Sequence, residues 1–152
     1  MRARMRGQKT GYHHGDLKQG LMEAAATLID IRGRHALTMR EAARRAGVSE
    51  AAPYRHFSNL DELLGAVALE GFDMLIADVD GASSAKAVRE AYLGFAQDFP
   101  GRYELMFGKL GDRKTATRRK HLVSDLAELT ERAGGLAALH GEASLRLAGL
   151  DA

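Results

Sequence analysis

The apolar residues of this chain recur at intervals of three and four positions, the spacing that places them on one face of an α-helix. Between Asp16 and Gly33, leucine, isoleucine and alanine follow this spacing, and no segment alternates as a strand would. The pattern predicts helices over residues 16–33, 38–47, 49–58, 59–79, 88–99 and 122–133, a short apolar turn over 103–107 and a weak helix after 136. We therefore expect an all-α protein.

Residues 38–57 carry the strongest local signals for where helices begin and end. Thr38 is a typical N-cap, and Glu41, three residues later, can accept a hydrogen bond from the Thr38 amide to complete a capping box. Gly47 suits the left-handed position that ends a helix, and Ser49 can cap the next one. Two short helices that pack through alanines and are joined by a glycine turn are typical of a helix-turn-helix unit.

The second helix of this unit has a predicted exposed face and a predicted buried face. Placing residues at steps of about 100° puts one group on the exposed side: Glu50, Ala51, Tyr54, Arg55 and Ser58. Pro53 and Phe57 fall on the core side, with Ala52 and His56 between the two faces. Because Pro53 has no N–H, it cannot bond the Ser49 carbonyl, and we expect it to stiffen the start of the helix.

Composition and charge are those of a globular chain with two unlike halves. Of the 152 residues, 45% are apolar, none is cysteine, and the net charge is +2. Residues 1–58 carry a net charge of +6, whereas residues 59–152 carry −4. A basic segment that contains a helix-turn-helix unit indicates phosphate binding, although a plain basic surface is the alternative. The lack of cysteine suits a cytoplasmic location, and no segment reads as a signal peptide or membrane span.

We divide the chain into a basic arm (1–12), a helix-turn-helix DNA-binding domain (13–59) and a helical ligand-binding or dimerisation domain (60–152). Arm cations can contact phosphates or a minor groove, or be a solvated tail. Apolar candidates for an effector pocket lie in the third part: Phe72, Tyr92, Phe95, Phe99, Tyr103, Met106 and Phe107. At helical spacing such a set also fits an ordinary core, and no converging polar groups identify a ligand.

Two stretches resemble the N-terminal region of the TetR (AcrR-like) family of bacterial transcriptional regulators. They are YHHGDLKQGLMEAA and ALTMREAARRAGVSEAAPYRHFSNLDELLGAV, which cover about residues 12–67. The Thr-capped helix, the alanine pair, the Gly-Val-Ser turn and the Tyr-x-x-Phe motif occur in the family order. FPGRYELMF also resembles the start of a small-molecule-binding C-terminal domain. The resemblance implies a homodimeric repressor that leaves a palindromic operator when a C-terminal effector displaces its fourth helix.

The resemblance also implies which residues contact DNA. By position these are Thr38, Arg40, Glu50, Ala51, Ala52, Tyr54, Arg55 and His56. The chemistry agrees for Arg55, whose guanidinium can bond O6 and N7 of guanine, and for Tyr54, whose hydroxyl can donate to a phosphate. His56 is open between phosphate contact and packing. Glu50 can accept from a cytosine amino group or serve only as an acid at the start of a helix.

Two departures from the family pattern lead to a second hypothesis. Leu60 stands where the family usually has a phosphate-gripping lysine, and the C-terminal half is shorter than in most members. The alternative to an effector-responsive repressor is thus a shortened DNA-binding relative that senses nothing and is monomeric. Sedimentation separates the two, because a monomer cannot span two half-sites.

A metal protein or enzyme is the third reading. His13, His14 and Asp16 could suggest metal ligands, but adjacent histidines point in different directions and no cysteine or distant acid pair completes a site. His121 and His140 have no evident partners, and no nucleophile spacing is present. We therefore expect no metal, no cofactor and no enzymatic activity.

Overall fold

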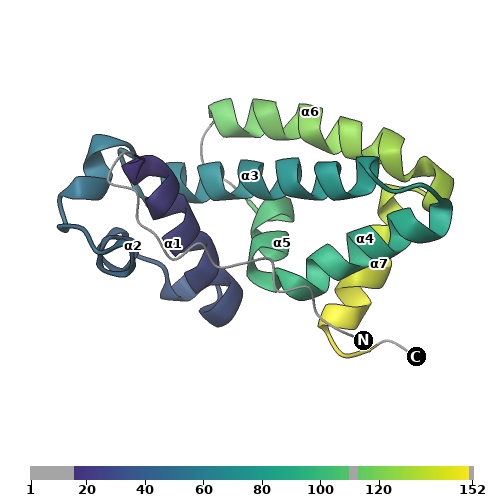
Figure 1. The fold of residues 1–152 in the computed structure, drawn as a ribbon, viewed down its shortest axis with the longest axis horizontal. Coiled ribbons are helices and arrows are strands. Elements are labelled where there is room, and N and C mark those ends of the chain that lie inside the picture. The colour runs from purple at the N-terminus through teal and green to yellow at the C-terminus, as the bar shows by residue number, and fades with distance from the viewer. Residues whose placement is uncertain (1–15, 110–112, 151–152) are drawn as a thin grey trace.

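The computed structural model describes residues 16–109 and 113–150, and every regular element in these ranges is helical, so the all-α prediction is confirmed there (Figure 1). The elements are α1 (Leu17–Arg32), η1 (Arg34–Ala36), α2 (Met39–Ala46), η2 (Ala52–Arg55), α3 (Leu60–Asp80), α4 (Ala85–Asp98), α5 (Pro100–Phe107), α6 (Arg113–Thr130), η3 (Glu131–Ala133) and α7 (Leu136–Leu147). The predicted arm, His13 and His14 lie outside the described residues. None of the described helices is both long and apolar enough to cross a membrane.

Polar side chains cap four helices; Asp16, Thr38 and Asn59 do so where the sequence predicts a start, whereas Ser84 caps α4, which begins three residues before the predicted start at 88. Each cap accepts a hydrogen bond from the amide three residues later, at 2.9–3.1 Å: Asp16, Thr38, Asn59 and Ser84. The capping box at Thr38 is only half formed, because the Glu41 carboxylate pairs with the Arg44 guanidinium, with 2.9 Å between Arg44 Nε and Glu41 Oε2. An i, i+3 pair on the helix surface therefore takes the acid that was expected to bond the Thr38 amide.

Two segments of the C-terminal half are more regular helices than the sequence predicts. Residues 103–107, expected as a turn, belong to α5, which begins at Pro100; proline fits a first helical position because its missing N–H would have no partner there. The weak helix expected after residue 136 is the regular twelve-residue α7. Its buried Leu139 and Ala143 lie one turn apart, and α7 packs on α4, so tertiary contacts stabilise it.

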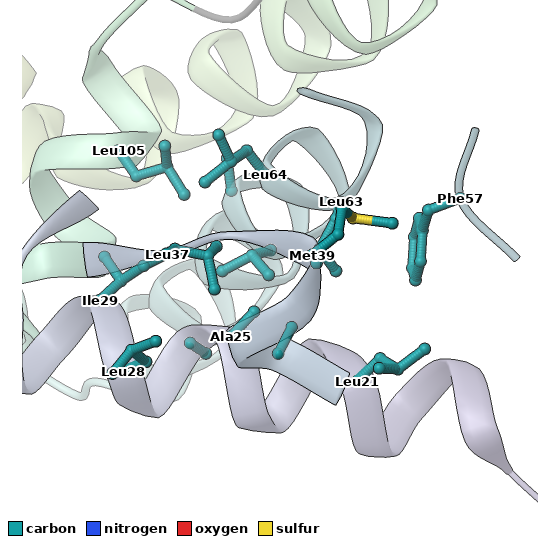
Figure 2. Packing of buried hydrophobic residues seen from close by; sticks show 14 residues of the cluster. Leu21, Ala25, Leu28, Ile29, Leu37, Met39, Phe57, Leu63, Leu64 and Leu105 are labelled. Atoms are coloured by element: carbon teal, nitrogen blue, oxygen red, sulfur yellow. The ribbon is translucent and has the colours of Figure 1, made fainter. Parts of the chain in front are cut away.

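The helices enclose two hydrophobic cores, and α3 belongs to both. The head core joins α1, α2 and the start of α3 (Figure 2), and its largest members are Leu21, Leu28, Ile29, Phe57, Leu63, Leu64 and Leu105. The C-terminal core lies among α3–α7 and includes Phe72, Leu75, Tyr92, Phe95, Tyr103, Met106, Leu126 and Leu139. Figure 1 shows α3 running from the head to the far end of the molecule beside α6. One helix thus connects the two halves without a linker.

A second connection joins the end of α1 to the start of α5, and we call it the α1–α5 junction (Ile29, Asp30, Gly101 and Arg102). Asp30 Oδ1 accepts from the Arg102 amide and Asp30 Oδ2 from Arg102 Nε, both at 2.8 Å. Both side chains are nearly buried, with 11% and 13% exposed. A Cβ at Gly101 would lie 2.1 Å from the Ile29 carbonyl oxygen, so only glycine allows the two backbones to approach this closely.

Candidate nucleic-acid interface

Gly47 sets the angle between the two elements of the helix-turn-helix unit. It has φ 72° and ψ 29°, the left-handed conformation predicted for it. Its amide donates to the Arg44 carbonyl and the Val48 amide to the Ala43 carbonyl, so the last turn of α2 has its carbonyls satisfied. Ala42 and Ala43 are fully buried beneath this turn. Alanines allow the close packing, as the sequence indicates.

The second element is shorter than predicted. Instead of an α-helix beginning at Ser49, residues 52–55 form the 3₁₀ turn η2. The Ala52 amide donates to the Ser49 carbonyl at 3.0 Å, and the Tyr54 amide donates to the Ala51 carbonyl at 3.3 Å. Both bonds join residues three positions apart, the spacing of a 3₁₀ helix. Pro53 lies between these donors and has no N–H for an α-helical bond. The sequence showed this missing bond, but its effect on the helix was underestimated.

The exposed and buried residues of this segment largely follow the prediction. Pro53 and Phe57 are buried, and the exposed group is Glu50, Ala51, Tyr54, Arg55, His56 and Ser58. Tyr54 is 58% exposed although it is a large aromatic side chain. His56, left open by the sequence, is on the surface. Ala52 is only 7% exposed and packs inward, so it does not share the surface of the other candidate contacts.

Arg40 joins this surface from α2 through an ion pair with Glu50. Arg40 Nε lies 2.9 Å from Glu50 Oε1, and the two side chains are 79% and 67% exposed. An exposed ion pair of this kind contributes at most about 1 kcal/mol to stability, so the two side chains can separate at a small free-energy cost. Thr38 also lies on the surface, but its hydroxyl oxygen already accepts the Glu41 amide. The structure thus brings Arg40 next to η2, as required for a shared surface.

Two features beside η2 were not predicted. Lys18 Nζ lies 5.9 Å from the centre of the Phe57 ring, which places an α1 cation near η2. A lysine at the start of a helix that packs on the unit was the available signal. Leu60, the residue in place of the family's lysine, packs against the head core. It therefore presents an apolar side chain where a phosphate contact was expected.

The predicted effector residues are mostly part of the C-terminal core. Phe72, Tyr92, Phe95, Tyr103 and Met106 are at most 3% exposed, while Phe99 and Phe107 are half-buried. A cleft of about 690 Å³ opens beside this core, between the end of α1, α5 and α7. Of the seven predicted residues only Tyr103 and Phe107 line it. Its other walls come from segments far apart in sequence, and periodicity within one helix could not identify them.

A chain of hydrogen bonds leads from the C-terminal core to this cleft. The Tyr92 and Tyr103 hydroxyl oxygens lie 3.1 Å apart, and the Tyr103 hydroxyl oxygen lies 2.5 Å from His140 Nδ1. Burial raises the pKa of Tyr103 to about 12 and that of Tyr92 further. Burial also lowers the pKa of His140, which favours its neutral form. The prediction that His140 has no partner is wrong, because its partner lies 37 positions away and cannot be found by spacing.

Among residues 16–109 and 113–150, no three histidine, aspartate or glutamate side chains lie close enough to hold a metal ion. His121 is exposed on α6. The structure therefore brings no described candidate metal ligands together.

Residues 21–67, which contain the helix-turn-helix unit, match the model of the bacterial regulatory proteins of the tetR family. The HTH-type transcriptional activator FasR of Mycolicibacterium smegmatis is 36% identical over 95 residues, which cover 57% of this chain and 43% of FasR. The chain spans about half the length of the curated relatives it matches.

Solved structures of similar fold cover more of the chain. A protein of unknown function from Rhodococcus sp. RHA1 matches with a TM-score of 0.67 and 28% identity, over 93% of this chain and 88% of that one. A TetR family transcription regulator from Marinobacter aquaeolei VT8 has a TM-score of 0.61 over 88% and 85%, and at 13% identity it shows the fold alone. The likeness therefore extends through the C-terminal helices.

Proposed function

We propose that this protein is a transcriptional regulator that binds double-stranded DNA through a reading face made of Arg40, Glu50, Ala51, Tyr54 and Arg55. The observation that carries the proposal is the exposure of Tyr54 and Arg55 on a segment whose neighbours Pro53 and Phe57 are buried. A buried anchor holds the exposed side chains in a fixed position, which sequence-specific contact requires. The match of residues 21–67 to the tetR family model supports the same function.

Each residue of the reading face has a chemical role in this proposal. Arg55 bonds a guanine edge in the major groove, because its planar guanidinium matches O6 and N7. Tyr54, Thr38 and the exposed His56 contact phosphates, which fixes the register. Arg40 leaves Glu50 for a phosphate or a base edge, and Glu50 is then free to accept from a cytosine amino group. Ala52, being buried, is not part of the proposed contact.

Replacing Arg55 tests the reading face. We expect Arg55→Ala to lower the preference for specific over random DNA by about 1–3 kcal/mol, because a bidentate base contact is lost. The measurement is a gel-shift titration on a site selected from a random DNA pool. Arg118→Ala, which removes an exposed arginine of α6, is the charge-matched control and should keep the preference. An unchanged ratio of specific to random affinity in Arg55→Ala would remove Arg55 from base reading.

We further propose that the regulator is a homodimer on a palindromic operator and a repressor that an effector releases. Family resemblance supports both points, and a regulator of this kind acts in the cytoplasm. Exposed leucines at the end of the described chain, Leu145 at 52% and Leu150 at 70%, are compatible with a subunit contact. A palindrome from the DNA selection and a dimer in sedimentation would support the proposal. A single half-site bound by a monomer would contradict it.

A further inference from the structure

The cleft between α1, α5 and α7 has walls from both halves of the molecule. Ile29 and Asp30 come from the head, Pro100 and Phe107 from α5, and His140 and Leu147 from α7. Its volume of about 690 Å³ is in the range of small-molecule sites, which are mostly apolar with a few placed polar groups. The uncharged polar side chains on its α7 wall are Ser144, whose hydroxyl already donates to the His140 carbonyl oxygen at 2.8 Å, and His140, whose ring can face a ligand.

The hydrogen-bond chain determines which nitrogen of His140 carries a proton. Tyr92 is fully buried, and Tyr103 is the hydrogen-bond partner of its hydroxyl among the described residues. If Tyr103 donated to Tyr92, the Tyr92 proton would have no acceptor, an unfavourable state for a buried group. Tyr92 therefore donates to Tyr103, and Tyr103 donates to His140 Nδ1. The His140 proton is then on Nε2.

His140 consequently offers the cleft a donor and no acceptor. Nδ1 is occupied by Tyr103, and Nε2 is hydrogen-bonded to none of the described residues. A ligand that uses His140 must present an acceptor oxygen. Among the described residues, the charged groups that line the cleft are Asp30 and Glu104, and none is a lysine or arginine, so an anionic acceptor is disfavoured. An uncharged carbonyl oxygen meets both conditions.

We propose that this cleft binds an uncharged, mainly apolar molecule whose carbonyl oxygen accepts a hydrogen bond from His140 Nε2. The apolar part of the molecule lies against Pro100, Phe107 and Leu147. A ketone, ester or amide belongs to this class, whereas carboxylates and amines do not. Because Asp30 of α1 and Gly101 of α5 both line the cleft and belong to the α1–α5 junction, the ligand lies beside both sides of that junction. The regulatory consequence, a change in DNA affinity, rests on the proposed function; the binding itself does not.

Three probes on one skeleton test the ligand class: benzylacetone, phenylbutyrate and phenylbutylamine. We expect benzylacetone to bind saturably and at least tenfold more tightly than the carboxylate or the amine, measured by titration followed by NMR. The ¹⁵N resonances of the His140 ring in the free protein should show a protonated Nε2 and an unprotonated Nδ1, and benzylacetone should shift the Nε2 signal. A proton on Nδ1, an unmoved Nε2 signal, or equal binding of phenylbutyrate would overturn the proposal.

Matched variants separate the site from general surface effects. His140→Phe should weaken benzylacetone binding at least tenfold, and His121→Phe, an exposed histidine on α6, should leave it unchanged. If His140→Phe fails to fold, the ring measurements on the natural chain decide the question. Benzylacetone that binds without changing the affinity for the selected DNA overturns only the regulatory consequence. Absence of DNA binding overturns the proposed function and leaves the binding result standing.

Discussion

The two hydrophobic cores differ in what they bury. The head core contains aliphatic side chains, alanines, one methionine and one aromatic ring, that of Phe57. The C-terminal core contains phenylalanines and two tyrosines, and Tyr92 and Tyr103 place hydroxyl groups inside it. A purely apolar core requires only close packing, whereas buried hydroxyls also require partners. In this molecule the hydroxyl chain ends at His140, beside the cleft.

This difference separates two tasks. Small and aliphatic residues pack the head closely, so the buried side chains of Pro53 and Phe57 are held in place. They in turn fix the position of the exposed residues of the proposed reading face. The C-terminal core connects its interior to a cleft through groups that a ligand can contact. Under the proposed function, the head serves as a scaffold of fixed shape, and the C-terminal half contains the groups that would respond to a small molecule. Three predictions test this contrast, in order of decreasing effect.

Truncating one leucine in each core tests whether the cores unfold together. Leu64→Ala in the head and Leu126→Ala in the C-terminal core remove side chains that are at most 1% exposed. Each should lower the free energy of unfolding by about 2–5 kcal/mol, because lost burial and a new cavity add. Since α3 runs through both cores, we expect one transition for each variant in denaturant titrations followed by circular dichroism. Two separated transitions would show that the cores are independent.

Adding a methyl group at the α1–α5 junction tests the contact between the halves. Gly101→Ala should destabilise the protein by about 1–3 kcal/mol, because the new Cβ meets the Ile29 carbonyl oxygen and one helix must shift. Gly94→Ala is the matched control within α4, where a Cβ meets nothing within 4 Å. It should stabilise by about 0.5–1 kcal/mol through helix propensity. Equal melting temperatures for the two variants would contradict the close approach at Gly101.

Alkaline titration tests the buried hydroxyls. The pKa of Tyr103 is about 12 in the folded protein, and that of Tyr92 is raised further by burial, against about 10 for an unfolded tyrosine. Between these values the unfolded chain loses protons that the folded chain keeps, so stability falls as pH rises above about 10. We expect Tyr92→Phe to reduce this fall by about 1 kcal/mol per pH unit. Tyr54→Phe, at an exposed tyrosine of the head, should follow the natural chain when unfolding is measured at each pH.

Features determined within a few residues were predictable from the sequence. Asp16, Thr38 and Asn59 cap helices through side chains three positions from their donors, and Gly47 adopts the left-handed turn alone. The same local reasoning found the exposed Tyr54 and Arg55. The 3₁₀ form of η2 was not predictable, because the competition between α-helical and 3₁₀ bonding at Pro53 depends on small energy differences.

Features that need distant partners were not predictable. Whether Leu139 and Ala143 form a helix depends on packing against α4, and the sequence pattern after residue 136 is weak by itself. The cleft requires α1, α5 and α7 to meet, and the partner of His140 is Tyr103 on another helix. The sequence alone does not indicate which residues of different helices lie close together in the fold.

The continuity of α3 determines how this molecule can be dissected. A fragment that stops at residue 59 would lack Leu63, Leu64, Val67 and Ala68, all fully or almost fully buried in the head core. Such a fragment would expose the apolar faces of α1 and α2 to water, and aggregation would be its expected fate. In hydrogen exchange, central amides of α3 should open only with global unfolding, since both cores protect the same helix. The boundary between the proposed DNA-binding part and the proposed ligand-binding part therefore falls inside one helix, and we expect no protease cleavage site between separately folded units.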